Sequence, residues 1–100
     1  MTITKSNENG KITLSLDGWL DTAAAPTLGA EVEAIEAADE IILDFDKVEY
    51  MSSSGLRQVV AAHRKAKELG AKLTVCRVHN EIMSIFALTG LDKKLTVTEA

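Results

Sequence analysis

Three consecutive serines, Ser52, Ser53 and Ser54, followed by Gly55, are the residues of this sequence best suited to carry chemistry. They lie where an apolar strand should give way to a helix. The first N–H groups of a helix have no partner inside it, and the helix macrodipole is positive there. A phosphoryl group on a serine at this position would therefore be stabilised locally. Serine is also a preferred N-cap residue, so helix capping is the competing explanation.

Other polar residues do not form a known catalytic or metal-binding pattern. Ser53, His63 and Asp44 are the residue types of a hydrolase triad. However, no Gly-x-Ser-x-Gly segment is present, and His63 should lie about 15 Å from Ser53 along the same helix. Cys76, His79 and His63 match no zinc spacing. No phosphate-binding glycine motif occurs either. We therefore expect a protein that is not an enzyme and that has no metal and no cofactor.

The composition describes one small aliphatic domain. The chain has 100 residues, 46% hydrophobic but only 4% aromatic, so its core must be aliphatic. A domain of this size can fold without disulfides, and the single cysteine fits a reducing compartment. A net charge of -4 argues against binding nucleic acid or an anionic membrane through charge alone. We expect one domain over residues 1–100, without a targeting or membrane-spanning segment, in the cytoplasm.

The N-terminal segment predicts a β-hairpin. Apolar and polar residues alternate over Lys11–Leu16, which is typical of a strand with one buried face. A shorter strand over Thr2–Lys5 should precede it, joined by a turn at Asn9-Gly10. Gly18 should then close the second strand.

The next segment has the spacing of a helix. Leu28, Val32 and Ile35 recur at i, i+4 and i+7, which predicts an amphipathic helix that starts near Thr22. Asp21 or Thr22 can cap its first turn.

The middle of the chain predicts a buried strand and a second helix. Ile41–Phe45 is short and almost continuously apolar, as in a strand covered on both faces. A helix should follow over Gly55–Leu69 and end at Gly70 in the left-handed conformation. Its inward face should consist of Leu56, Val59, Val60, Ala62, Ala66 and Leu69.

The C-terminal third predicts one more strand, one more helix and an edge strand. The strand should contain Leu73–Val78, and Asn80 should cap a helix that stops at Gly90. Leu95–Val97 should form the edge strand. The order β-β-α-β-α-β-α-β predicts an α/β domain with a mixed, mostly parallel sheet, an N-terminal hairpin and about three amphipathic helices.

Several segments resemble the signature of the STAS domain family, the fold of anti-sigma factor antagonists and of the cytoplasmic tails of sulphate transporters. Ile41–Asp44, Val48 and Met51–Leu56 resemble the family's apolar strand with Asp, followed by Asp-Ser-Ser-Gly-Leu. Gly18–Ala23 is similar to its Gly-x-Leu-Asp-x-Ala segment, and Leu88–Leu91 to the segment after its last helix. The resemblance covers essentially the whole chain and implies a STAS domain over residues 1–100.

The resemblance implies a phosphorylation switch. In the family's antagonists, a partner kinase that is also an anti-sigma factor phosphorylates a serine at the start of the second helix. The unphosphorylated protein binds that kinase and frees the sigma factor, and the phosphorylated protein is released. The alignment places the acceptor at Ser53, with Ser52 and Ser54 as alternatives. Ser52 stands where many antagonists carry Asp, a departure that bears on how the kinase recognises the acceptor.

The resemblance also implies partners and a partner-binding surface. The partners would be an anti-sigma factor/serine kinase and a phosphatase, without contact to nucleic acid or insertion into a membrane. Asp21, Thr22 and the segment Ser52–Gly55 would face the partner, although helix capping explains Asp21 and Thr22 as well. Arg57 would contact a phosphate or an acidic partner, or else be a solvated charge.

Two more residues have two interpretations each. The family pattern favours a structural or partner-facing role for Asp44 over that of a catalytic base. Trp19 follows Gly18 in a loop and is either an exposed partner anchor or a cover over the core.

Two other functions use the same loop. In a STAS subunit of a lipid-transport ABC complex, the loop and helix would contact an ATPase without a phosphorylation cycle. Alternatively, the helix N-terminus would bind a nucleotide or another anion as a ligand.

Overall fold

The computed structural model describes residues 1–100 as five strands and four helices. They are β1 (Thr2–Glu8), β2 (Lys11–Leu20), α1 (Ala25–Glu33), β3 (Glu40–Met51), α2 (Ser53–Glu68), β4 (Lys72–Val78), α3 (Asn80–Thr89), α4 (Leu91–Lys94) and β5 (Thr96–Glu99). The strands form one sheet in the order β1-β2-β3-β4-β5, in which β1 is antiparallel to β2 and all other pairs are parallel. The predicted α/β fold, with its hairpin and mostly parallel sheet, is confirmed.

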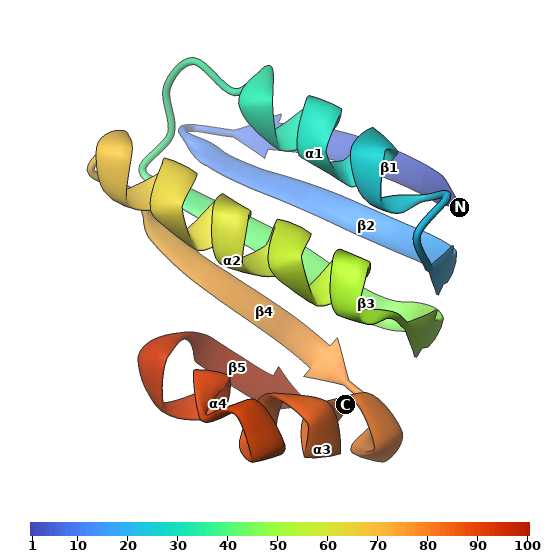
Figure 1. Ribbon diagram of the computed structural model, residues 1–100. Coiled ribbons are helices and arrows are strands. Elements are labelled where there is room, and N and C mark those ends of the chain that lie inside the picture. Colours follow the sequence, from blue (N-terminus) through green and yellow to red (C-terminus); the bar gives the residue numbers. More distant parts are fainter.

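The helices pack on one face of the sheet. Figure 1 shows α1 and α2 side by side across β2 and β3. On the same side Phe86 of α3 meets Phe45 of β3, with ring centroids 6.2 Å apart. Right-handed crossovers between strands that follow one another in sequence order place every helix on the same side. The expectation that Ile41–Phe45 is covered on both faces is therefore wrong.

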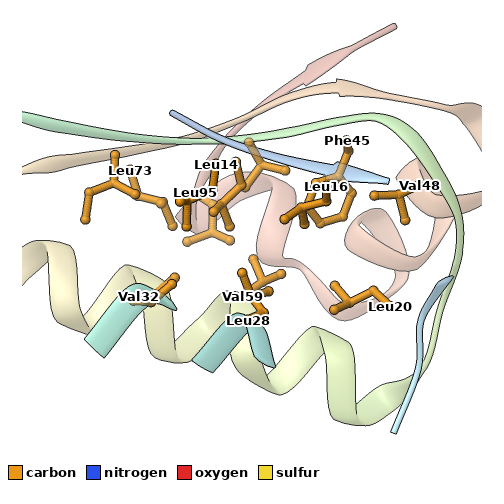
Figure 2. Packing of buried hydrophobic residues seen from close by; sticks show 14 of the residues in the cluster. Leu14, Leu16, Leu20, Leu28, Val32, Phe45, Val48, Val59, Leu73 and Leu95 are labelled. Carbon is orange, nitrogen blue, oxygen red and sulfur yellow. The ribbon is translucent and has the colours of Figure 1, made fainter. Parts of the chain in front are cut away.

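The core lies between that face and the helices. It is one cluster of 21 buried residues. In Figure 2, Leu14, Leu16 and Phe45 point from the sheet toward Leu28 and Val59 of the helices. All five have a relative accessibility of at most 2%. The core is thus aliphatic apart from two phenylalanines, as the composition predicted. None of the helices has the length and apolar character needed to span a bilayer.

Strands β2 and β3 run further than predicted. Gly18 does not end β2, which continues to Leu20. Strand β3 continues past Phe45 to Met51. Its ladder to β4 stops at Asp44, so the second half of β3 pairs with β2 alone. In that half Val48 and Met51 are buried while Lys47, Glu49 and Tyr50 are exposed, so its sequence has no continuous apolar run.

The start of α1 also differs from the prediction. The helix begins at Ala25 rather than near Thr22, and its N-cap residue, Ala24, makes no side-chain capping bond. Asp21 instead closes the turn before the helix, because the Ala24 N–H donates to its Oδ1 at 2.9 Å. Ile35 lies beyond the helix end at Glu33 and is nevertheless 1% exposed.

Helices α2 and α3 end at the glycines that were expected to terminate them. Gly70 and Gly90 have φ values of +68° and +75°, as expected for residues that end helices. Asn80 is the first residue of α3 rather than its cap, which is His79. Helix α4 has only four residues, too few for a periodic pattern, and was not predicted.

On the inward face of α2, Val59, Ala62 and Ala66 are buried, and Leu56 and Leu69 pack against the core. Val60 is only partly buried and lies outside the core cluster.

Candidate functional site

The serine segment lies beside the carboxyl end of β2. Strands β2 and β3 are parallel, and Leu20 pairs with Met51 at their ends. The Ser52 N–H then donates to the Leu20 carbonyl oxygen at 2.9 Å. The beginning of α2 is therefore attached to the point where the chain leaves β2. The carboxyl ends of parallel strands are where α/β proteins commonly bind ligands and partners.

Ser52 is the N-cap residue of α2. Its Oγ accepts a hydrogen bond from the Gly55 N–H at 3.1 Å and donates to the Leu20 carbonyl oxygen at 3.4 Å. An Asp at this position could accept the first bond but, when ionised, could not donate the second. The hydroxyl thus caps the helix and ties it to β2.

Ser54 is joined to the turn before α1. The Thr22 hydroxyl donates to the Ser54 Oγ at 3.3 Å. Asp21 holds the same turn through its bond to Ala24. The structure therefore brings Thr22 and the serine segment together, while Asp21 supports them from within its turn.

Ser53 differs from its two neighbours. It is exposed at the first position of α2, and its hydroxyl makes no hydrogen bond within the protein. The first turn of α2 contains no acidic residue. Arg57 is exposed four residues further on, a spacing that places two side chains on one face of a helix. The Ser53 hydroxyl is thus free at the positive end of the α2 dipole.

Gly55 allows this close packing. It is buried, and a Cβ atom at this position would lie 2.5 Å from the Leu20 carbonyl oxygen and 2.7 Å from the Leu20 Cγ. No side chain fits there unless α2 moves away from β2. Gly55 is therefore a structural residue of the site.

Asp44 lies elsewhere, on the outer face of the sheet. It is 9% exposed and accepts hydrogen bonds from the Arg77 Nε at 3.1 Å, from the Arg77 Nη2 and from the Asp46 N–H at 3.0 Å. The bonds from Arg77 lower the pKa of the Asp44 carboxyl against the opposing effect of its burial. A carboxylate held in this way is a poor general base, so its role is structural.

Arg77 is the partner that the sequence did not reveal. Alternation along Leu73–Val78 would direct it toward the helices. Its φ of +54°, rare for a residue other than glycine, accompanies a register irregularity between Val75 and Val78, and its side chain reaches Asp44.

The same network continues to the start of α3. Arg77 Nη1 lies 3.8 Å from Asp46 Oδ2, and the His79 Nε2 lies 2.7 Å from the Asp46 carbonyl oxygen. These contacts join β3 to the end of β4 where their backbone ladder has stopped. His79 is thus engaged with β3, which explains why its side chain does not cap α3.

The structure does not assemble a Ser53–His63–Asp44 triad or a metal site from Cys76, His79 and His63. Asp44 is bound to Arg77, and His63 lies in the third turn of the helix that Ser53 begins. No group of three His, Cys, Asp or Glu side chains is placed to hold a metal ion. Burial, followed by the charge of Asp44, raises the pKa of the Cys76 thiol, which disfavours the thiolate.

Trp19 is exposed and does not cover the core. Its relative accessibility is 56%, and that of Tyr50 is 47%. The two ring centroids are 5.4 Å apart, and the Trp19 Nε1 donates to the Glu49 Oε2 at 3.2 Å. An aromatic pair is thus exposed at the ends of β2 and β3, and its Tyr50 lies two residues before Ser52.

Comparison with known proteins agrees with this fold. The family model described as STAS domain matches residues 2–100. The anti-sigma-B factor antagonist of Bacillus subtilis (strain 168) is 30% identical over 95 residues, which span 94% of this chain and 86% of that protein. A second such antagonist, from Listeria monocytogenes, is 26% identical over 90 residues, or 88% of this chain and 79% of that one.

Solved structures match over nearly the whole chain. An anti-sigma factor antagonist from Mycobacterium paratuberculosis has a TM-score of 0.83 at 25% identity, covering 99% of this chain and 86% of the other. The anti-sigma factor antagonist SpoIIAA in its unphosphorylated form has a TM-score of 0.78 at 17% identity, covering 99% and 89%. Its phosphorylated form, described as a Bacillus cell fate determinant, has a TM-score of 0.77 at 19% identity, covering 96% and 90%. The chain belongs to the STAS domain family, and its named relatives are anti-sigma factor antagonists.

Proposed function

We propose that this protein is an anti-sigma factor antagonist controlled by phosphorylation of Ser53. When unphosphorylated it binds an anti-sigma factor that is also a serine kinase, and when phosphorylated it is released. The observation that carries the proposal is the exposed Ser53 hydroxyl at the N-terminus of α2, without a hydrogen bond in the protein. The two neighbouring serines have hydroxyls that are already bonded.

The hydrogen bonds favour Ser53 over its neighbours as acceptor. Phosphorylation of Ser52 would remove the hydroxyl that donates to Leu20 and disturb the helix cap. Phosphorylation of Ser54 would place the group against Thr22. Phosphorylation of Ser53 would break no bond of the folded protein.

Phosphorylation of Ser53 should leave the folded domain stable but weaken its binding to the partner. A phosphoserine adds about 1.5 to 2 negative charges, which the α2 dipole partly offsets. A partner carboxylate ~5 Å away would be repelled by roughly 1 kcal/mol in watery surroundings and by several at a drier interface. Since about 1.4 kcal/mol changes affinity tenfold, this repulsion is enough to release the partner.

The proposed partner-binding surface consists of Asp21, Thr22, Ser52–Ser54 and Arg57, whereas Gly55 is buried beneath it and supports it from inside. Thr22 and the serine segment are joined in the structure, and Arg57 is exposed one turn further along α2. The protein would act by binding rather than by catalysis, in the cytoplasm, and a phosphatase would restore the unphosphorylated form. The antagonist names of its relatives favour this function over that of a lipid-transport subunit.

Mass spectrometry tests the phosphorylation. The protein is incubated with ATP and with the anti-sigma factor kinase encoded in the same genome. We expect a gain of ~80 Da, one phosphoryl group, that maps to Ser53. Ser53→Ala should abolish the gain, and Ser54→Ala should retain it. An active kinase that leaves Ser53 unmodified would contradict the proposal.

A binding measurement tests the mechanism of release. Ser53→Asp should bind the kinase at least about tenfold more weakly than the wild type, because it introduces a charge at the acceptor position. Ser53→Asn is the matched uncharged control. Equal binding by Ser53→Asp and Ser53→Asn would show that charge repulsion is not the mechanism.

A further inference from the structure

Trp19 and Tyr50 are two of only three large hydrophobic residues that the protein exposes. Single exposed apolar side chains are ordinary, but a tryptophan in contact with a tyrosine at the surface, with the ring planes tilted by 46°, is not. The pair offers a rigid aromatic area without filling any part of the core. Tryptophan and tyrosine are also enriched among the residues that dominate protein interfaces.

An irregularity of the sheet brings the two rings together. Gly18 pairs with Val48, whereas the next residue of β2, Trp19, pairs with Tyr50. Glu49 is therefore an extra residue in β3, a β-bulge, and Gly18 adopts a φ of +116° beside it. Bulges re-aim side chains and often lie next to functional sites. Here the bulge places an aromatic residue from each strand, and a carboxylate bonded to the Trp19 indole, at one end of the sheet.

Glu49, the polar side chain that contacts Trp19, indicates what kind of group the rings can receive. The Glu49 Oε2 accepts the hydrogen bond from the Trp19 indole, while its Oε1 makes no hydrogen bond. Beyond Glu49 lies a groove of about 850 Å³ between β3 and the start of α3. The charged side chains and the histidine that line it are Asp17, Asp46, Lys47, Glu49, His79 and Glu81. Trp19 and Tyr50 do not line this groove, but Glu49 borders it. Asp46 is already paired with Arg77, which leaves Asp17, Glu49 and Glu81 against Lys47. A positively charged group therefore complements the surface beside the rings.

We propose that Trp19, Tyr50 and Glu49 form a second contact with the protein partner, and that they receive an arginine or lysine side chain of it. The cation would lie against the aromatic rings and pair with the free Glu49 oxygen, an arrangement in which tryptophan is the most favourable ring. This inference rests on the proposed function, because the partner is the same anti-sigma factor kinase. The kinase would then contact this protein at two places, the start of α2 and the aromatic pair at the end of the sheet.

Binding measurements with the purified kinase test the inference. Trp19→Ala should weaken binding about 30-fold, as expected for a central interface tryptophan. Trp19→Phe should weaken it less, because an aromatic face remains. Glu49→Gln should weaken binding several-fold and reduce its dependence on salt concentration, since one charge pair is lost. Leu88→Ala, which removes the third exposed hydrophobic side chain, is the control and should bind as the wild type does.

Trp19 also provides a direct signal, because it is the only tryptophan of the chain. Its fluorescence emission should shift to shorter wavelength when the kinase binds. An unchanged emission, together with unchanged affinity of Trp19→Ala, would overturn the inference while leaving the proposed function intact. Failure of the wild type to bind the kinase at all would overturn both. If Trp19→Ala alters only self-association of this chain, the surface belongs to a second copy and the inference is wrong.

Discussion

At the residue scale, the Ser52 hydroxyl stabilises the start of α2 through two hydrogen bonds. It caps α2 through the Gly55 N–H and ties the helix to β2 through the Leu20 carbonyl. Ser53, its neighbour, makes no such bond. Of these two adjacent serines, Ser52 therefore stabilises the start of α2, and the Ser53 hydroxyl has no partner in the protein.

Replacing Ser52 with alanine should destabilise the protein by about 1 kcal/mol, because the N-cap bond is lost. Ser52→Asp should cost less, since a carboxylate still accepts the Gly55 N–H and suits the positive end of the helix. Urea unfolding, read as a change of midpoint at constant slope, measures both. Ser53→Ala is the control and should stay within about 0.5 kcal/mol of the wild type. An unchanged midpoint for Ser52→Ala would contradict the capping role.

The Asp44 carboxylate should make stability depend on pH. Hydrogen bonds from Arg77 lower its pKa in the folded protein below the ordinary value of 3.8. The folded state therefore favours the ionised form. The stabilisation is present above the ordinary pKa, and it is lost as the pH falls below that value through the lower pKa of the folded state.

Urea unfolding of the wild type and of Asp44→Asn at a series of pH values measures this effect. The wild type should be the more stable protein at neutral pH, and the difference should shrink as the pH falls below about 4. Asp92→Asn removes an exposed carboxylate of α4 that has no ion pair and serves as control. A difference that is independent of pH would contradict the assigned ion pair.

At the scale of elements, two glycines allow a helix to pack closely against its neighbour. The two glycines differ in the atom that an added Cβ would meet. A Cβ atom at Gly55 of α2 would meet the backbone oxygen of Leu20 at 2.5 Å. At Gly29 of α1 it would meet the Gln58 Oε1 at 2.7 Å. A backbone atom in a paired strand cannot move away alone, whereas the end of a glutamine side chain can rotate.

Gly55→Ala should therefore destabilise the protein by about 1–3 kcal/mol, the usual range for overpacking. Gly29→Ala should be neutral or stabilising by up to ~1 kcal/mol, because alanine is the better helix former. Urea unfolding of the matched pair measures the difference. If both substitutions have the same effect, the contact with Leu20 does not limit how closely α2 packs.

At the scale of the whole molecule, one continuous core joins the sheet to all the longer helices. Phe86 connects α3 to Phe45 at the centre of the sheet. Phe86→Ala should cost about 3–5 kcal/mol, a large share of the 5–15 kcal/mol typical of a domain. Leu88→Ala, on the same helix but 87% exposed, should change stability by less than about 0.5 kcal/mol. Thermal or urea unfolding checks both, and a small loss for Phe86→Ala would mean that α3 is not part of the cooperative unit.

The sequence by itself determined the family, the order of the strands and the three longer helices, and most of the inward residues, but not the short helix α4 or the exact bounds of α1, β2 and β3. Its apolar spacing is a local property, because residues seven positions apart lie on one face of a helix and alternate residues on one face of a strand. The serine segment was also visible, since its residue types and its place before a helix are both local. Gly70 and Gly90 marked helix ends for the same reason.

Only the tertiary structure decided which side chains of different elements contact each other and which stay without a partner. The Asp44–Arg77 pair joins residues 33 positions apart, and it requires Arg77 to leave the alternation of its strand. The Trp19–Tyr50 pair depends on a bulge, which arises from the register between two strands rather than from either alone. The Ser53 hydroxyl is likewise distinguished from those of Ser52 and Ser54 only by the tertiary bonds that these two make with Leu20 and Thr22. Strand pairing and the packing of α2 beside β2 set these three features, and they bring together residues whose separation along the chain carries no periodic signal.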